Sequence, residues 1–255
     1  MPIADFSLKG KTAVVTGASR GIGESIARAL AENGANVVIA ARKQESLEGV
    51  ASAIKKDFGV KCVAAACHTG DPNAIAALFA KVKAEFGRCD VLVNNAATNP
   101  YFGPAIQMEL PAFDKTFEVN VRGYFVATQC AARMMVEQGK GSIINVASIA
   151  GLSPGAMQVV YSMTKAAVIN MTKGFAKELG SSNVRVNAIC PGVVETKFAS
   201  VLINTPEIYD QFIKQIPLGR HAQPSEMAGL AVYLASDASS YTTGAAFVSD
   251  GGMTA

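Results

Sequence analysis

Histidine is scarce in this chain, with two copies among 255 residues. A zinc site built on histidines, or a Ser-His-Asp catalytic triad, is therefore poorly supplied. The five cysteines are an odd number, lie in otherwise apolar segments and show no C-x-x-C spacing. We interpret them as buried thiols and predict that the protein binds no metal.

Long hydrophobic runs and a strong net charge are also missing. Charged residues or glycines interrupt every apolar run well before the roughly 18 residues that a membrane span requires. Residues 1–11 lack the apolar core and the cleavage site of a secretion signal. The formal net charge is +3, and no basic run is interleaved with aromatic residues. We expect a soluble cytoplasmic protein that binds neither membranes nor nucleic acids.

Short β-branched runs alternate with longer helical patterns along most of the chain. The predicted strands cover residues 12–16, 36–41, 61–67, 90–94, 142–146, 184–189 and 244–249. The predicted helices cover residues from about 21 to 33, 44–58, 72–86, 111–137, 155–179 and 224–235. Several strands are apolar on both faces, which favours a parallel sheet covered by helices on both sides. The sequence therefore predicts an α/β fold, a doubly wound Rossmann-type sheet of about seven strands.

The composition, half apolar and 17% charged, is typical of a protein with a sizeable core. No linker divides the chain, so we expect a single domain over residues 1–255. The alternation lapses over about 193–219, which we interpret as a substrate lobe or lid within that domain. Ligands bind such sheets at the carboxyl ends of the strands, where the winding reverses, so we expect the site there.

A glycine-rich turn follows the first predicted strand. It reads Thr16-Gly-Ala-Ser-Arg-Gly-Ile-Gly23, so its glycines are spaced G-x-x-x-G-x-G rather than in the common G-x-G-x-x-G. Glycines at this place let a pyrophosphate approach the backbone at the N-terminus of a helix. The residues expected to contact the cofactor here are Gly17, Ser19, Arg20, Gly21, Ile22 and Gly23. The alternative is a tight turn that binds nothing.

The end of the second strand indicates which nucleotide is bound. NAD-binding proteins usually place an acidic residue there to hold the ribose 2′-hydroxyl, whereas this chain has Ala41-Arg42-Lys43. The Arg42 guanidinium can hold a 2′-phosphate through paired hydrogen bonds, with Arg20 nearby in the glycine turn. This favours NADP(H) as the preferred cofactor, with NAD(H) as the other possibility. Alternatively, Arg42 and Lys43 are an ordinary solvated start of a helix.

Tyr161 and Lys165 stand four residues apart on a predicted helix and therefore on one face of it. A tyrosine, whose reference pKa is about 10, is a poor acid or base near neutrality, but an adjacent cation favours the phenolate and lowers that pKa. The pair is thus a candidate general acid/base. Taken alone, the same spacing also occurs by chance in many exposed helices.

Together with further motifs, these segments resemble the short-chain dehydrogenase/reductase family over essentially the whole chain. The further motifs are Asn94-Asn-Ala-Ala97, Asn120, Ser148, Pro191-Gly192 with Thr196, and Asp250-Gly-Gly252. The resemblance implies hydride transfer between the nicotinamide and a carbonyl or secondary alcohol. It implies that Ser148 holds the substrate oxygen and that Tyr161 exchanges the proton. It also implies that Lys165 binds the nicotinamide ribose and lowers the tyrosine pKa, and that Asn120 positions a water in the proton relay.

The resemblance implies further cofactor contacts as well. Asn94 and Ala96 would line the adenosine and ribose side. The pyrophosphate and the nicotinamide carboxamide would be flanked by Ile22, Pro191, Gly192, Val194 and Thr196.

Two residues depart from the family's pattern. Ala97 stands where the family commonly has glycine, which restricts the backbone locally. His68 stands where many members have an aspartate that caps the adenine. His68 could hydrogen-bond or stack on the adenine. The run Cys67-His-Thr-Gly70, together with Asn94-Asn-Ala-Ala-Thr-Asn-Pro100, resembles the subgroup of NADP-dependent carbonyl and retinal reductases. The alternative for His68 is a surface loop residue.

Apolar residues predominate where the substrate should bind. They are Phe198, Leu202, Ile203, Tyr209, Phe212, Ile213 and Ile216 in the predicted lobe, and Met157, Val159 and Val160 before Tyr161. We therefore expect a small-molecule carbonyl or alcohol with an apolar body.

Two alternatives to this activity stay open. A 3-oxoacyl-[acyl-carrier-protein] reductase would need basic surface residues, such as Arg122, Lys197 or Lys214, to receive an acidic carrier protein. A nucleotide-sensing regulator would bind the cofactor without turnover, but such proteins usually lack the tyrosine or the lysine.

The resemblance finally implies an oligomer, usually a homotetramer, with a homodimer as the alternative. The helices near 111–137 and 155–179 would pack against their counterparts in other subunits. The strand near 244–249 would form a second contact.

Overall fold

Seven parallel strands form one sheet at the centre of the molecule. The computed structural model describes residues 4–197 and 206–255. The strands are β1 (Thr12–Thr16), β2 (Asn36–Ala41), β3 (Cys62–Ala66), β4 (Val91–Asn94), β5 (Gly141–Val146), β6 (Val184–Pro191) and β7 (Ala246–Ser249). Their order across the sheet is β3-β2-β1-β4-β5-β6-β7, and every neighbouring pair is parallel.

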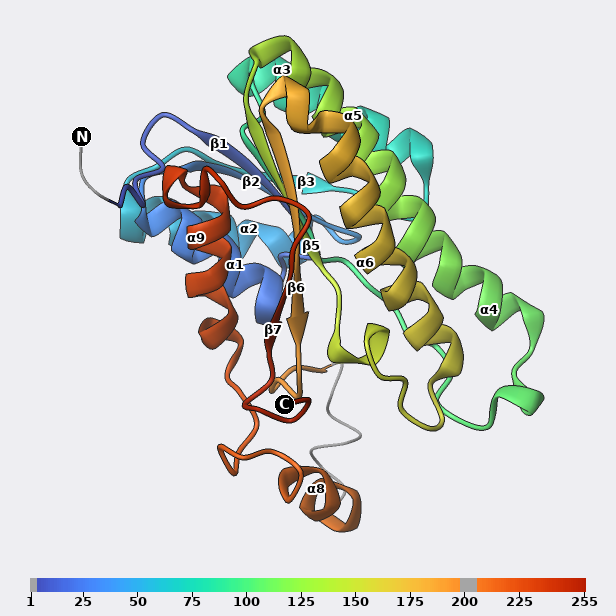
Figure 1. The fold of residues 1–255 in the computed structure, drawn as a ribbon. Coiled ribbons are helices and arrows are strands. Elements are labelled where there is room, and N and C mark those ends of the chain that lie inside the picture. Colours follow the sequence, from blue (N-terminus) through green and yellow to red (C-terminus); the bar gives the residue numbers. More distant parts are fainter. Residues whose placement is uncertain (1–3, 198–205) are drawn as a thin grey trace.

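Helices cover both faces of this sheet (Figure 1). One layer consists of α1 (Gly21–Glu32), α2 (Glu45–Phe58) and α9 (Ala228–Ala235). The other consists of α3 (Pro72–Phe86), α5 (Gly123–Gln138) and α6 (Val159–Leu179). Two further helices, α4 (Leu110–Phe117) and α8 (Pro206–Ile213), complete the set of described α-helices. The predicted doubly wound α/β fold is confirmed.

Local sequence explains where these elements begin and end. The β1 segment Thr-Ala-Val-Val-Thr is buried along its whole length, as expected for an inner strand between two helical layers. The Asp71 carboxylate caps α3 by accepting a hydrogen bond from the Asn73 backbone N–H at 2.9 Å, and Pro72 occupies the first helical position. Gly87 then ends α3 with a φ of 69°, a left-handed conformation that glycine adopts freely.

The helix predicted over 111–137 is not a single regular α-helix. It divides into α4, a π-helical turn over Glu118–Arg122, and α5. A Cβ atom on Gly123 would overlap the Thr69 carbonyl oxygen, so the loop after β3 lies directly against this turn. The irregularity thus coincides with a contact between segments far apart in the sequence, which helical periodicity does not report.

The start of α6 is also later than predicted, at Val159 instead of residue 155. Met157, just before it, has a φ of 66°, which is uncommon for a residue with a side chain. The Met157 carbonyl accepts a hydrogen bond from the Gly103 backbone N–H at 2.8 Å. This bond ties the segment before α6 to the loop after β4.

The two ends of the predicted lobe, over about 193–219, lie side by side. Val194 and Ala222 form a parallel bridge, in which Ala222 N donates to Val193 O (2.9 Å) and Glu195 N donates to Ala222 O (2.8 Å). Between these limbs lies α8. Three residues predicted to line the substrate pocket, Phe198, Leu202 and Ile203, lie outside the described residues.

Two further sequence-based expectations concern burial and membranes. Cys62, Cys67, Cys89 and Cys190 are buried free thiols, as expected, whereas Cys130 is half-buried. In the described part of the chain, no helix has both the length and the apolarity needed to cross a membrane.

Candidate active site

The winding of the sheet reverses between β1 and β4, the place where doubly wound sheets bind ligands. The glycine turn leaves β1 there, and the loop beginning at Asn95 leaves β4. The two are joined directly, because the Asn95 side-chain amide donates to Thr16 O (3.0 Å) and to Gly17 O (3.2 Å). Asn95, which the sequence did not single out, therefore shapes the turn.

Only glycine fits at two positions of this turn. Gly17 has a φ of 66°, and a Cβ there would lie 2.8 Å from the Ala96 Cα. A Cβ on Gly23 would overlap the Gly17 carbonyl oxygen. Arg20, at the N-cap of α1, makes no side-chain capping hydrogen bond. A bare backbone turn leading into a helix N-terminus without a side-chain cap fits the phosphates of a dinucleotide.

Two arginines could hold the 2′-phosphate on the adenosine ribose of such a nucleotide. Arg42 directly follows β2, and Arg20 belongs to the glycine turn after the neighbouring β1. Both side chains are exposed, and neither forms an ion pair with any other residue that the structure describes. Both cations are thus available to a phosphate.

Tyr161 and Ser148 meet at the carboxyl end of β5. Tyr161 lies in the first turn of α6, and a hydrogen bond joins its side chain to that of Ser148. The Ser148 hydroxyl also accepts a hydrogen bond from the Ala150 backbone N–H at 3.1 Å. Burial raises the pKa of Tyr161 to about 12, although the hydrogen bond with Ser148 acts in the opposite direction. Burial is thus the main influence on the Tyr161 pKa, and the effect of Lys165 on it stays a prediction.

Lys165 is buried, with 1% of its surface exposed. Its ammonium donates a hydrogen bond of 2.7 Å to the Val146 carbonyl at the end of β5. The same Nζ lies 5.6 Å from the centre of the Tyr161 ring and 5.4 Å from that of Tyr124. Burial lowers the pKa of Lys165 to about 7. The predicted pair is thus brought together, but in surroundings that penalise both charged forms.

Asn120 lies in the π-helical turn and is fully buried. Its side chain holds Thr98 from both sides, because Oδ1 accepts from Thr98 N (2.8 Å) and Nδ2 donates to Thr98 O (2.9 Å). Nδ2 also donates to Thr164 Oγ1 at 3.2 Å. Sequence reasoning missed Thr98 because nothing in a separation of 22 residues indicates this contact.

Asn94 does not present its side chain to the surface of the site. It is 1% exposed, and its Nδ2 donates to Thr128 Oγ1 (3.1 Å) and to Asn145 Oδ1 (2.9 Å). Only its backbone could face a nucleotide. Ala96, by contrast, is half-buried beside Gly17.

His68 is held in a polar cluster between the loop after β3 and the helices. Its Nδ1 accepts from the Gly70 backbone N–H at 3.0 Å, and its Nε2 lies 3.1 Å from the Lys115 ammonium. Lys115 in turn pairs with Glu118 at 2.8 Å. The ring is therefore neither a free surface residue nor a group without partners.

The residues after β6 approach the glycine turn. Gly192 packs closely on Asp250, since a Cβ on Gly192 would lie 2.7 Å from the Asp250 Cβ. Val194 is buried in the bridge with Ala222. The Thr196 methyl lies 3.3 Å from where a Cβ on Gly21 would be. Of the expected residues after β6, Thr196 thus lies beside the glycine turn, while Gly192 and Val194 pack against Asp250 and Ala222.

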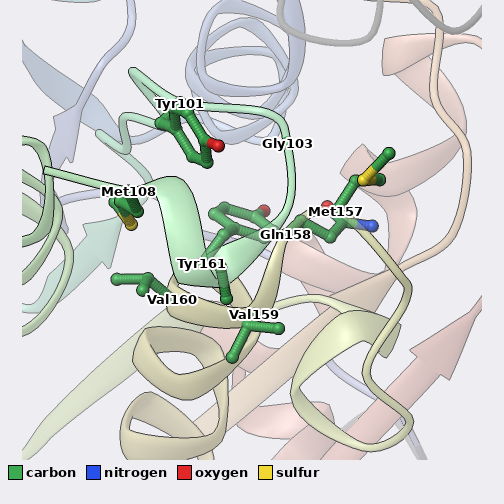
Figure 2. A pocket seen from close by; sticks show the side chains of 9 residues that line it. Tyr101, Gly103, Met108, Met157, Gln158, Val159, Val160 and Tyr161 are labelled. Carbon is green, nitrogen blue, oxygen red and sulfur yellow. The ribbon is translucent and has the colours of Figure 1, made fainter.

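A small pocket opens beside Tyr161 (Figure 2). It is lined by Tyr101, Gly103, Ala105, Met108, Met157, Gln158, Val159, Val160 and Tyr161. Three of these, Met157, Val159 and Val160, belong to the predicted substrate residues. Tyr101 and Met108 were not predicted, because they reach the pocket from the loop after β4.

Comparison with known proteins agrees with this geometry. The family model described as enoyl-(acyl carrier protein) reductase matches residues 17–254. Dehydrogenase/reductase SDR family member 4 from Oryctolagus cuniculus is 35% identical over 96% of this chain and 94% of its own length. The 3-oxoacyl-[acyl-carrier-protein] reductase FabG from Aquifex aeolicus is 38% identical over 98% of this chain and 99% of its own length.

A solved structure shows the same likeness. Gluconate 5-dehydrogenase from Burkholderia cenocepacia, in complex with NADP and tartrate, superimposes with a TM-score of 0.94 at 33% identity. The match covers 98% of this chain and 97% of that one. With full-length matches in sequence and structure, the chain belongs to the short-chain dehydrogenase/reductase family of oxidoreductases.

Proposed function

We propose that this protein transfers a hydride between NADP(H) and a carbonyl or secondary alcohol of an apolar substrate, with Tyr161 as the general acid/base. The observation that carries the proposal is the grouping of half-buried Ser148 with buried Tyr161 and Lys165 at the carboxyl end of β5. The phenol is already hydrogen-bonded to Ser148, and the lysine ammonium lies beside its ring.

Each side chain has a distinct role in this proposal. The nicotinamide supplies or accepts the hydride. Ser148 orients the substrate oxygen, and Tyr161 donates the proton to that oxygen on reduction and removes it on oxidation. Lys165, which donates a hydrogen bond to the Val146 carbonyl, binds the nicotinamide ribose and in its protonated form favours the phenolate. The Asn120 side chain holds the loop after β4 through Thr98. The Asn120 backbone positions a water molecule of the proton relay.

Different residues are assigned to different parts of the cofactor. The glycine turn, from Gly17 to Gly23, holds the pyrophosphate at the start of α1. Arg42 and Arg20 bind the 2′-phosphate, and Ala96 and the Asn94 backbone line the adenosine side. The residues assigned to the nicotinamide side are Pro191, Gly192, Val194 and Thr196. The relative that was solved with NADP supports this choice of nucleotide.

Replacement of the tyrosine hydroxyl tests the mechanism. Tyr161→Phe should bind NADPH as the wild type does, yet lose a factor of about 10² to 10⁴ or more in turnover, because no other group supplies the proton. The measurement is NADPH oxidation at 340 nm over a panel of ketones and aldehydes, with NADPH binding followed by fluorescence. Retained turnover in the variant would refute the role of Tyr161. Absence of turnover in the wild type with intact NADPH binding would favour a nucleotide-sensing regulator.

The apolar side chains beside Tyr161, Met108, Met157, Val159 and Val160, favour ketones and aldehydes, but a second candidate activity has its own support. The Aquifex aeolicus relative is a 3-oxoacyl-[acyl-carrier-protein] reductase, and Arg122 is exposed beside the site. The same panel should therefore contain a 3-oxoacyl thioester, free and on a carrier protein. A much lower KM for the carrier-bound form would assign the chain to the second activity.

We also propose that the protein works as a homotetramer, or failing that a homodimer, in the cytoplasm. Large apolar side chains are exposed on the outer helices and near the last strand: Phe125 and Val136 on α5, Met163 on α6, and Val248 on β7. The five free thiols suit a reducing compartment.

A further inference from the structure

The lobe after β6 contains a chain of hydrogen bonds that the proposed reaction does not use. It joins three segments: Glu195 on the outgoing limb, Tyr209 on α8, and His221 on the returning limb. The Tyr209 hydroxyl lies 2.7 Å from His221 Nδ1, and His221 Nε2 lies 3.3 Å from Glu195 Oε2. The two rings also meet edge to face, with centroids 5.7 Å apart. A single imidazole thus contacts both other segments of the lobe.

The chemistry of the partners determines the direction of these bonds. An ionised carboxylate only accepts, so the Nε2 of His221 carries the proton and donates to Glu195. In the neutral ring Nδ1 is then an acceptor, and the Tyr209 hydroxyl donates to it. Hydrogen bonds from Gln223 and then from His221 lower the pKa of Glu195, which keeps it ionised. The order is therefore Tyr209 to His221 to Glu195, with every donor and acceptor satisfied.

Further hydrogen bonds connect the segments at the base of the lobe on the His221 side. Arg220 forms two hydrogen bonds with Glu226, at 2.7 and 2.8 Å, and Gln223 Nε2 donates to Glu195 Oε2 at 2.5 Å. Ala222 is bridged to Val194, as described above. His221 thus belongs to a hydrogen-bonded base, and its contact with Tyr209 joins α8 to that base.

The base of the lobe lies next to the glycine turn. Glu195 directly precedes Thr196, whose methyl packs toward Gly21. On the far side, α8 stands beyond the carboxyl edge of the sheet, where β6 and β7 end (Figure 1). The hydrogen bonds among Tyr209, His221 and Glu195 therefore link α8 to the segment that packs beside the glycine turn.

We propose that His221 is a positioning residue. Through Tyr209 it holds α8 at the edge of the substrate site, and through Glu195 it links α8 to the segment beside the glycine turn. This inference rests on the proposed function in so far as α8 borders the substrate. The expected consequence of losing the link is a higher KM for the carbonyl substrate with unchanged kcat and unchanged NADPH affinity.

The test compares two tyrosine-to-phenylalanine variants. Tyr209→Phe removes the hydroxyl from the link, while Tyr233→Phe removes a matched hydroxyl that bonds Thr242 Oγ1 at 2.9 Å, away from the lobe. We expect Tyr209→Phe to raise the KM about three- to tenfold, the scale of one neutral hydrogen bond. We expect Tyr233→Phe to leave it unchanged. An unchanged KM in Tyr209→Phe, or equal effects in both variants, overturns the proposal.

Two further readouts do not depend on turnover, so they separate failure of this inference from failure of the proposed function. The chain has two histidines, and nitrogen-15 spectra with His221→Gln for assignment resolve the His221 ring. We expect a proton on Nε2 and a shifted Nδ1 signal in Tyr209→Phe. Trypsin should cleave after Lys214, next to α8, about three- to tenfold faster in that variant. A proton on Nδ1, an unmoved signal or an unchanged cleavage rate contradicts the link.

Discussion

Burial acts in opposite directions on the two titratable residues of the site. It raises the pKa of Tyr161 to about 12 and lowers that of Lys165 to about 7, because both charged forms lose contact with water. Near neutrality the phenol therefore keeps its proton, whereas the lysine is poised to lose its own.

This burial predicts how stability depends on pH. An unfolded lysine keeps its proton up to a pKa near 10.5, whereas folded Lys165 loses it near pH 7, so the unfolded chain binds more protons between these values. Stability should therefore rise from pH 7 to pH 9 by about 2 kcal/mol more in the wild type than in Lys165→Met. Above pH 10 the raised pKa of Tyr161 reverses the trend, since the unfolded phenol then ionises first.

Urea unfolding of both proteins at pH 7, 8 and 9 measures this difference. Both unfolding curves must be two-state for the comparison to hold. Parallel pH profiles for the wild type and Lys165→Met would show that Lys165 remains charged in the folded protein.

At the residue scale, the proposed choice of NADP(H) rests on Arg42. Its exposed guanidinium follows β2 and is not paired with any described carboxylate, so Arg42→Ala should weaken NADPH binding relative to NADH by roughly 1.5–3 kcal/mol. The measurement is the ratio of the two dissociation constants by fluorescence titration. Lys43→Ala is the matched control, since it removes the adjacent exposed cation. An unchanged ratio in Arg42→Ala would show that the 2′-phosphate binds elsewhere.

At the scale of elements, the π-helical turn between α4 and α5 places Asn120. The turn lies against the loop after β3 at Gly123 and Thr69, and its Asn120 side chain reaches the loop after β4 at Thr98. The π-helical turn therefore contacts two loops, the one after β3 and the one after β4. π-helical turns of this kind are frequent at functional sites.

Two glycine variants separate packing from helix propensity at this turn. Gly123→Ala should destabilise the protein by about 1–3 kcal/mol, because its Cβ would overlap the Thr69 carbonyl oxygen. Gly49→Ala, in the middle of α2 with nothing within 4 Å of its new Cβ, should stabilise by roughly 0.5–1 kcal/mol. Denaturant unfolding of both variants checks the pair. A stabilised Gly123→Ala would mean that the two segments can separate at little cost.

At the scale of the whole molecule, the outer face of α5 and α6 is the expected subunit contact. Phe125 is 43% exposed there, next to Phe175 at a ring distance of 5.6 Å. An exposed apolar surface of this kind is typical of an interface. We therefore expect Phe125→Asp to lower the subunit number, because a carboxylate would be buried without a partner.

Sedimentation velocity of the wild type and two variants tests this expectation. Phe6→Asp is the control, since Phe6 is 44% exposed but lies near the N-terminus, outside α5 and α6. A monomeric wild type would contradict the oligomer. Dissociation by both variants would contradict the assignment of the contact to α5.

Local patterns in the sequence were sufficient for the sheet and for most helix boundaries. The strands buried on both faces, such as β1 and β4, and the glycine turn after β1 are properties of short segments, so they could be read in order along the chain. The spacing of Tyr161 and Lys165 likewise determined that they share a face of α6. Family motifs then indicated which residues should meet.

Contacts between distant segments required the tertiary structure. Asn95 instead of Asn94 shapes the glycine turn, Asn120 holds Thr98, and His221 joins Glu195 to Tyr209, and none of these pairs is marked by spacing. The burial that raises the Tyr161 pKa likewise exists only once the sheet and helices pack together, so it could not be predicted from local sequence.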